Sequence, residues 1–157
     1  MFDTIIWATD GSELADSTLP LLTELADLCG SKIVAVHADE ALQGPHADES
    51  PMHAAAEDVR AKIAGQVDDL RHAGFATADL RPVVSGCHST ARLIADAASE
   101  FEADLIVVAS DGHRPLVRGA LGGVSLELLS LAPCPVLAVP ELPQCAVRVH
   151  DADAVTA

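Results

Sequence analysis

Four short segments of this 157-residue chain combine glycines, small side chains and acidic or hydroxyl groups in a way that suits anion binding. Glycines let backbone N–H groups approach an oxyanion closely, and a helix that begins at Val124 would add the positive end of its dipole. We therefore expect these segments to bind a phosphate-like anion. The segments are residues 8–12 (ATDGS), 38–39 (AD), 109–112 (ASDG) and 122–125 (GGVS).

Alternating apolar runs and helical patterns must position these segments. Five apolar runs rich in Val, Ile and Leu are separated by apolar residues at helical spacing, which predicts a parallel sheet covered by helices. Ligands of such sheets bind beyond the carboxyl ends of the strands, where the strand order reverses. The predicted strands are residues 4–8, 32–38, 81–85, 104–109 and 135–140, with helices between them over residues 17–30, 59–74, 89–102 and 124–131.

Local signals refine the predicted elements. Pro20 suits the first turn of a helix that begins near Ser17, and Ser89 or Thr90 suits the cap of another. Pro82 has no N–H to donate, so its strand belongs at an edge of the sheet.

The chain is expected to fold as one domain over residues 1–140. Residues 104–109 form its most hydrophobic run and predict a central strand. Residues 43–51 are rich in Gly, Pro and charged side chains and predict a mobile loop. Residues 141–157 lack periodicity and predict a flexible tail outside the core.

Composition excludes several classes of protein. The chain has 9 Lys and Arg against 24 Asp and Glu, a net charge of −15, which disfavours nucleic-acid and membrane-surface partners. It lacks the roughly 18 consecutive apolar residues of a membrane span, and its start does not resemble a signal peptide, so we expect a cytoplasmic protein. Its 4 cysteines are widely spaced without a C-x-x-C pair, as expected for reduced thiols.

Three stretches together carry a family resemblance: TIIWATDGS, DLIVVASDG and GGVSLELLSLAPCPVLAVP. Over residues 2 to about 140 the chain resembles the universal stress protein family. The resemblance implies a three-layer α/β/α sandwich of the adenine nucleotide alpha hydrolase-like type, with a five-stranded parallel sheet in the order 3-2-1-4-5. It also implies a homodimer through the last strand, residues 135–140, and binding of ATP or AMP with Mg²⁺ or Mn²⁺.

The phosphate loop of nucleotide-binding members follows G-x2-G-x9-G-[ST], and this chain keeps part of it. Gly112 and Gly122 match, whereas Ala109 replaces the first glycine and Gly123 replaces the hydroxyl residue. Backbone N–H groups at the start of the next helix could still hold a phosphate, with Ser125 as a nearby hydroxyl.

Charged residues within this loop oppose one another. Asp111 adds negative charge near the expected phosphates, and His113, Arg114 and Arg118 offset it. A divalent cation would offset it further.

On the nucleoside side, the resemblance places Asp10 beside the nucleotide, with Thr9 flanking it and Ala38 at the adenine edge. The residues also allow a simpler interpretation, in which Asp10 forms an Asx turn with Ser12 and the glycines are ordinary turn residues. We expect His37 to pack against the sheet, and no histidine spacing predicts a metal site. The predicted nucleotide site consists of Ala8, Thr9, Asp10, Gly11, Ser12, Ala38, Val108, Ala109, Gly112, Gly122, Gly123, Val124 and Ser125.

Two functions from different classes remain open. One is a stress-response regulator whose adenine-nucleotide occupancy reports the state of the cell. The other is a nucleotide-free dimeric interaction protein with a degenerate phosphate loop.

Catalysis beyond slow ATP hydrolysis is not expected, because no residue set here can activate water efficiently. A serine hydrolase is disfavoured because the segment around Ser110 lacks the first glycine of G-x-S-x-G. A phospho-receiver domain is disfavoured because Gly86 and Cys87 stand where it needs an acceptor Asp.

Overall fold

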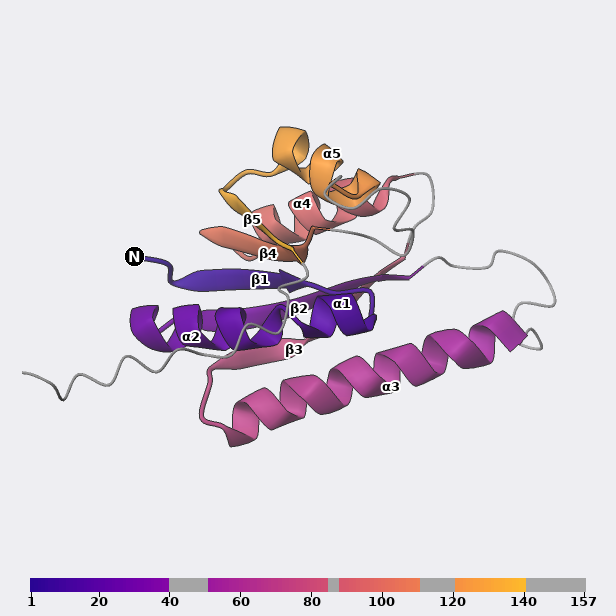
Figure 1. Ribbon diagram of the computed structural model, residues 1–157, viewed down its shortest axis with the longest axis horizontal. Helices are drawn as coiled ribbons and strands as arrows, with labels where there is room; N and C mark the ends of the chain where they lie inside the picture. Colours follow the sequence, from indigo (N-terminus) through magenta and orange to yellow (C-terminus); the bar gives the residue numbers. More distant parts are fainter. Residues whose placement is uncertain (40–50, 85–87, 111–120, 141–157) are drawn as a thin grey trace, which may run out of the picture.

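Five parallel strands form a single sheet (Figure 1). The computed structural model describes residues 1–39, 51–84, 88–110 and 121–140. The strands are β1 (Thr4–Ala8), β2 (Lys32–Asp39), β3 (Thr77–Val84), β4 (Leu105–Ala109) and β5 (Val136–Val139). They lie in the order β3-β2-β1-β4-β5, which confirms the predicted sheet and the edge position of the strand that contains Pro82.

Helices cover both faces of this sheet, so the predicted three-layer sandwich is confirmed (Figure 1). The helices are α1 (Glu13–Asp16), α2 (Leu19–Cys29), α3 (Pro51–His72), α4 (Thr90–Glu100) and α5 (Gly123–Leu131). Helices α2 and α3 pack on one face, and α4 and α5 pack on the other. None of the helices in the described residues is long and apolar enough to cross a membrane.

The alternation of side chains along β1 supplies both halves of the core. Ile5 and Trp7 are fully buried beneath α2 and α3, whereas Ile6 is fully buried beneath α4. The indole Nε1 of Trp7 donates to the Thr18 hydroxyl at 3.1 Å. This buried bond fixes the chain between α1 and α2 against the sheet.

The first helical region divides into two helices. Ser12 caps α1 by accepting from the Ala15 N–H at 3.2 Å, and Pro20 is the second residue of α2. The prediction that Pro20 lies in a first helical turn is therefore confirmed. Gly30 ends α2 with a φ of +67°, as expected for a glycine cap.

Two element starts differ most from the sequence prediction. Helix α3 begins at Pro51, where a loop was predicted, because proline and the alanines that follow suit a first turn. Strand β3 begins at Thr77 and not at Arg81, because pairing with β2 extends it over Ala78 and Asp79, whose residue types have low strand propensity. Strand β4 lies inside the sheet between β1 and β5, as expected for the most hydrophobic run.

Several predicted features lie outside the described residues. They are the loop over residues 43–50, Ser85, Cys87, residues 111–120 with Gly112, and the tail over residues 141–157. Cys29 and Cys134 are described, and both are free thiols that are half-buried.

Candidate functional site

A pocket of about 140 Å³ opens at the carboxyl ends of β1, β2 and β4, where the N-terminal end of α5 meets them. We call it the rim pocket. It brings together every predicted site residue that the structure describes except Gly11 and Ser12, which lie in the adjoining turn. Its lining residues are Ala8, Thr9, Asp10, Ala15, Ala38, Thr90, Ile94, Val108, Ala109, Gly122, Gly123, Val124 and Ser125.

Sequence reasoning missed three of these lining residues, Ala15, Thr90 and Ile94. Ala15 comes from α1, and the other two come from the first turns of α4. The amphipathic pattern of α4 showed that Ile94 is buried, but which end of the sheet it reaches depends on how α4 packs. Thr90 was recognised only as a possible helix cap, and the cap is in fact Ser89.

Local hydrogen bonds shape the turn at the end of β1. The Thr9 N–H donates to the Val36 carbonyl at 3.0 Å, and the Thr9 hydroxyl accepts from the Gly11 N–H at 3.1 Å. The Ser12 N–H donates to Oδ1 of Asp10 at 2.9 Å, so the Asx turn is present. Asp10 nevertheless remains exposed in the pocket wall, so this turn presents its carboxylate at the rim.

Helix α3 anchors the same turn from the outside. The Lys62 ammonium donates to the Gly11 carbonyl at 2.7 Å and to Oδ2 of Asp16 at 2.6 Å. Gly11 has a φ of +76°, and an added Cβ would lie 2.6 Å from Cγ1 of Val59. Only glycine fits this position without strain. No signal in the sequence identifies Lys62, because its partner lies 51 residues away.

His37 packs as expected and does not line the rim pocket. It is buried, and its Nδ1 lies 2.9 Å from the Thr9 carbonyl. Since a carbonyl oxygen only accepts, Nδ1 carries the proton in this bond. His37 therefore joins β2 to the turn after β1.

The opposite wall of the pocket is the start of α5. The Gly122 N–H donates to the Ser110 carbonyl at 2.6 Å, and among the described residues no side chain caps this helix, whose N-cap is Gly122. The hydroxyl of Ser125, which is buried, donates to the Ala109 carbonyl at 2.8 Å and so is directed at the protein. Because the first N–H groups of a helix have no partner within it, those of Gly123 and Val124 are the donors available to an anion.

The charges of the described lining are few. Asp10 is its one carboxylate, and it has no lysine, arginine or histidine. The positive end of the α5 dipole is thus the attraction for an anion in this part of the site. The described residues contain no group of three His, Cys, Asp or Glu side chains that could hold a metal.

Residues 1–140 match the universal stress protein family. The chain belongs to this family. No curated protein sequence matches it.

Solved structures of universal stress proteins and related chains share the fold. A universal stress protein from Burkholderia pseudomallei is 27% identical, with a TM-score of 0.64 over 88% of this chain and 96% of its own. The hypothetical protein MJ0577 is 22% identical, with a TM-score of 0.78 over 90% of this chain and 98% of its own. A universal stress protein in complex with cAMP is 22% identical, with a TM-score of 0.59 over 88% of this chain and 96% of its own.

Proposed function

We propose that this universal stress protein binds an adenine nucleotide, ATP or AMP, in the rim pocket and acts in the cytoplasm as a regulator whose occupancy reports the state of the cell. The observation that carries the proposal is the meeting of an exposed carboxylate, Asp10, with the uncapped start of α5 across one pocket. The structural neighbour in complex with cAMP supports it, because that protein shares the fold and binds an adenine nucleotide.

The two walls suit different parts of a nucleotide. Ala8, Ala38, Val108 and Ile94 offer apolar surface to a base. The carboxylate of Asp10 can accept from N–H or O–H groups of a nucleoside.

The phosphates would lie outside the enclosed space. At about 140 Å³ the pocket is smaller than the roughly 300–1,000 Å³ of most ligand sites, so it suits a nucleoside with phosphates reaching the N–H groups of α5. We expect Mg²⁺ or Mn²⁺ to arrive with the phosphates, because the described residues hold no metal-binding group of their own.

Catalysis is not part of the proposed function. Among the described lining residues, Asp10 is the one group that could accept a proton, and its Oδ1 takes part in the Asx turn. We expect ATP hydrolysis to be slow or absent.

We further propose that the protein is a homodimer through β5. This strand lies at the edge of the sheet, and an exposed edge favours pairing with another strand. Leu126 and Leu129 of the neighbouring α5 are 58% and 54% exposed, which adds apolar surface beside that edge. Light scattering should give the mass of two chains at micromolar concentration, and a strict monomer would contradict this proposal.

Calorimetric titration with ATP and AMP tests the nucleotide site. Asp10→Ala should weaken binding about ten-fold or more, because hydrogen bonds to charged groups contribute about 1.5–3 kcal/mol. Asp10→Asn is the matched control, because its amide oxygen can still accept from the Ser12 N–H while the charge is lost. Equal nucleotide affinity in the natural protein and both variants would show that Asp10 does not contact the nucleotide.

The nucleotide-free interaction protein is the second candidate, favoured by the departures from the phosphate-loop pattern at Ala109 and Gly123. It is supported if the natural protein binds no nucleotide and the double variant Ala109→Gly with Gly123→Ser binds ATP. If the double variant also binds none with its fold intact, the pocket itself excludes the nucleotide.

A further inference from the structure

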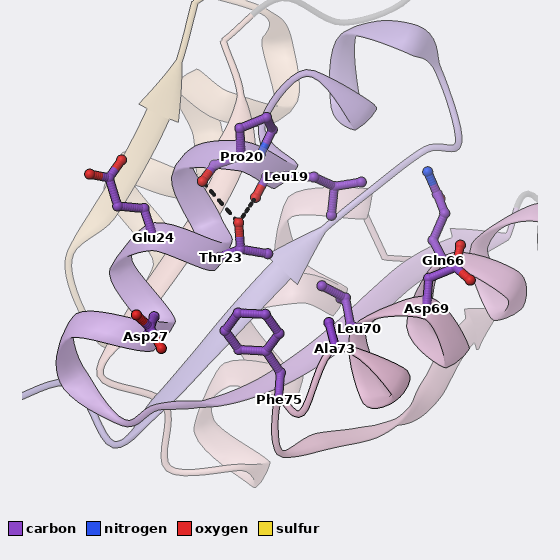
Figure 2. A pocket seen from close by; sticks show the side chains of 10 residues that line it. All are labelled: Leu19, Pro20, Thr23, Glu24, Asp27, Gln66, Asp69, Leu70, Ala73 and Phe75. Carbon is purple, nitrogen blue, oxygen red and sulfur yellow. Dashed lines mark hydrogen bonds between the residues drawn. The ribbon is translucent and has the colours of Figure 1, made fainter. Parts of the chain in front are cut away.

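A second concavity lies between α2 and α3 (Figure 2). These helices cover the face of the sheet opposite α4 and α5 (Figure 1). We call it the α2–α3 groove. Its volume is about 570 Å³, and it shares no lining residue with the rim pocket. Its lining residues are Leu19, Pro20, Thr23, Glu24, Asp27, Gln66, Asp69, Leu70, Ala73 and Phe75.

The base of the groove is apolar. Leu70 is buried in the core, and Leu19 and Phe75 are half-buried against it (Figure 2). The Thr23 hydroxyl donates to the carbonyls of Leu19 and Pro20, both at 3.0 Å, so its proton is directed back to its own helix. The groove therefore offers an occupant apolar contact and few donors.

The rim of the groove is acidic. Glu24 and Asp27 stand on α2, Asp69 stands on α3, and all three are exposed. They take part in none of the ion pairs found among the described residues, and the described lining of the groove contains no lysine or arginine. These carboxylates lie on two facing helices, so a cationic occupant would meet negative charge from both sides.

Gln66 lies at one side of the groove and is held by the protein. Its Nε2 donates to Oδ1 of Asp16 at 2.9 Å, and its Oε1 is buried with no hydrogen-bond partner among the described residues. Because that oxygen is enclosed, the acidic rim is the feature that calls for N–H donors from an occupant.

We propose that the α2–α3 groove docks a basic amphipathic helix of a partner protein. Its apolar side chains would lie on Leu19, Leu70 and Phe75, and its Lys or Arg side chains would meet the acidic rim. A groove between two helices is a common receptor for such a segment, and a net charge of −15 accelerates its approach.

Two other occupants fit the groove less well. The chain's own residues 141–157 contain one arginine, Arg148, against three carboxylates, so they lack the required charge. A second copy of the protein, with 9 Lys and Arg against 24 Asp and Glu, has no excess of basic residues to meet the acidic rim, and the proposed dimer uses β5 and not this groove.

The test uses fluorescence anisotropy at physiological salt with a labelled 16-residue helical peptide that has leucines on one face and arginines flanking them. A peptide with glutamate in place of every arginine should not bind. Ala73→Lys places volume and positive charge at the mouth of the groove and should weaken binding about ten-fold or more. Ala64→Lys is the matched control, because it makes the same change at an exposed position of α3 outside the groove, and it should have little effect.

A second pair of variants tests the charges alone. Asp27→Asn with Asp69→Asn should weaken binding about five-fold or more. Asp96→Asn with Glu102→Gln removes the same charge away from the groove and should change affinity less than about two-fold.

Three results would overturn the proposal. They are the absence of arginine-peptide binding, equal losses in the groove and control variants, and a change in the protein's own oligomeric mass on Ala73→Lys. The last would make a second copy the occupant.

Discussion

The two walls of the rim pocket are built in different ways. At the end of β1, the turn is held by side chains: Thr9 and Asp10 accept from backbone N–H groups, and Lys62 donates from α3. At the start of α5, one hydroxyl, that of Ser125, fixes the helix to β4, and the surface offered to a ligand is backbone.

This difference shows which substitutions the pocket can tolerate. Backbone donors persist whatever side chain the position carries. In the proposed site, Gly123 in place of a hydroxyl residue would therefore remove one phosphate contact and leave the backbone N–H groups in place. The β1 wall depends on residue types, so changes there should have larger effects. The following predictions test this contrast, from the largest expected effect to the smallest.

Gly11→Ala should be the most disruptive change. The positive φ of Gly11 and the 2.6 Å approach to Val59 together should lower the free energy of unfolding by about 2–4 kcal/mol. Urea denaturation measures this. Gly30→Ala is the control, because its φ is also positive, at +67°, but no atom lies within 4 Å of the added Cβ. Equal losses in the two variants would show that contact with α3 does not matter.

Ser125→Ala should destabilise the α5 wall by about 1–3 kcal/mol, because it leaves the Ala109 carbonyl without its donor at a buried position. Thermal or urea unfolding would measure the loss. Ser12→Ala, which removes an ordinary helix cap, should cost about 1 kcal/mol. An undetectable effect of Ser125→Ala would mean that this hydroxyl does not hold α5 to β4.

Gly123→Ser should strengthen nucleotide binding by about 1 kcal/mol, the usual net contribution of one added hydrogen bond. The side chain fits, because no atom lies within 4 Å of a Cβ added there. Calorimetry with ATP on this variant and on Gly123→Ala separates the hydroxyl from the added carbon. Equal affinities would show that no phosphate comes near this position.

Asp104 lies before β4, at the end of the sheet away from the rim pocket, and should affect stability alone. Its Oδ2 accepts from the N–H groups of Thr4 at 3.1 Å and Asp3 at 2.7 Å, and these bonds lower the pKa of the carboxyl. A lowered folded pKa stabilises the protein above the unfolded value of about 3.9, and that contribution is lost as the pH falls through the folded pKa.

Asp104→Ala should therefore reduce stability slightly at neutral pH, with the difference from the natural protein narrowing below about pH 4. Unfolding curves across this range measure it. Nucleotide affinity should not change. A changed affinity would show that Asp104 and the rim pocket, at opposite ends of the sheet, are coupled.

Much of the fold follows from local signals in the sequence. Pro82 predicted an edge strand because it has no N–H to donate, and a hydroxyl cap at Ser89 or Thr90 predicted the start of α4. The start of β3 at Thr77 could not be predicted in this way, since pairing with β2 and not residue preference decides it.

The same distinction between local signals and tertiary packing applies to the residues of the candidate site. Residues at or just after the carboxyl ends of strands, such as Asp10 and Ala38, could be placed in advance because all parallel strands end at one edge of the sheet. Ile94 and Lys62 could not, because their positions depend on how α4 and α3 pack against the sheet. Sequence pattern shows which face of a helix is buried, but not what that face meets.

The most direct test of the account is an NMR titration of the ¹⁵N-labelled protein with ATP and Mg²⁺. The account predicts saturable shifts of the backbone N–H signals of Thr9, Asp10, Gly123 and Val124, which lie on the two walls of the rim pocket. Signals of the α2–α3 groove, such as those of Gln66 and Phe75, should not move. No shifts at millimolar ATP, or shifts confined to residues away from the rim pocket, would contradict it.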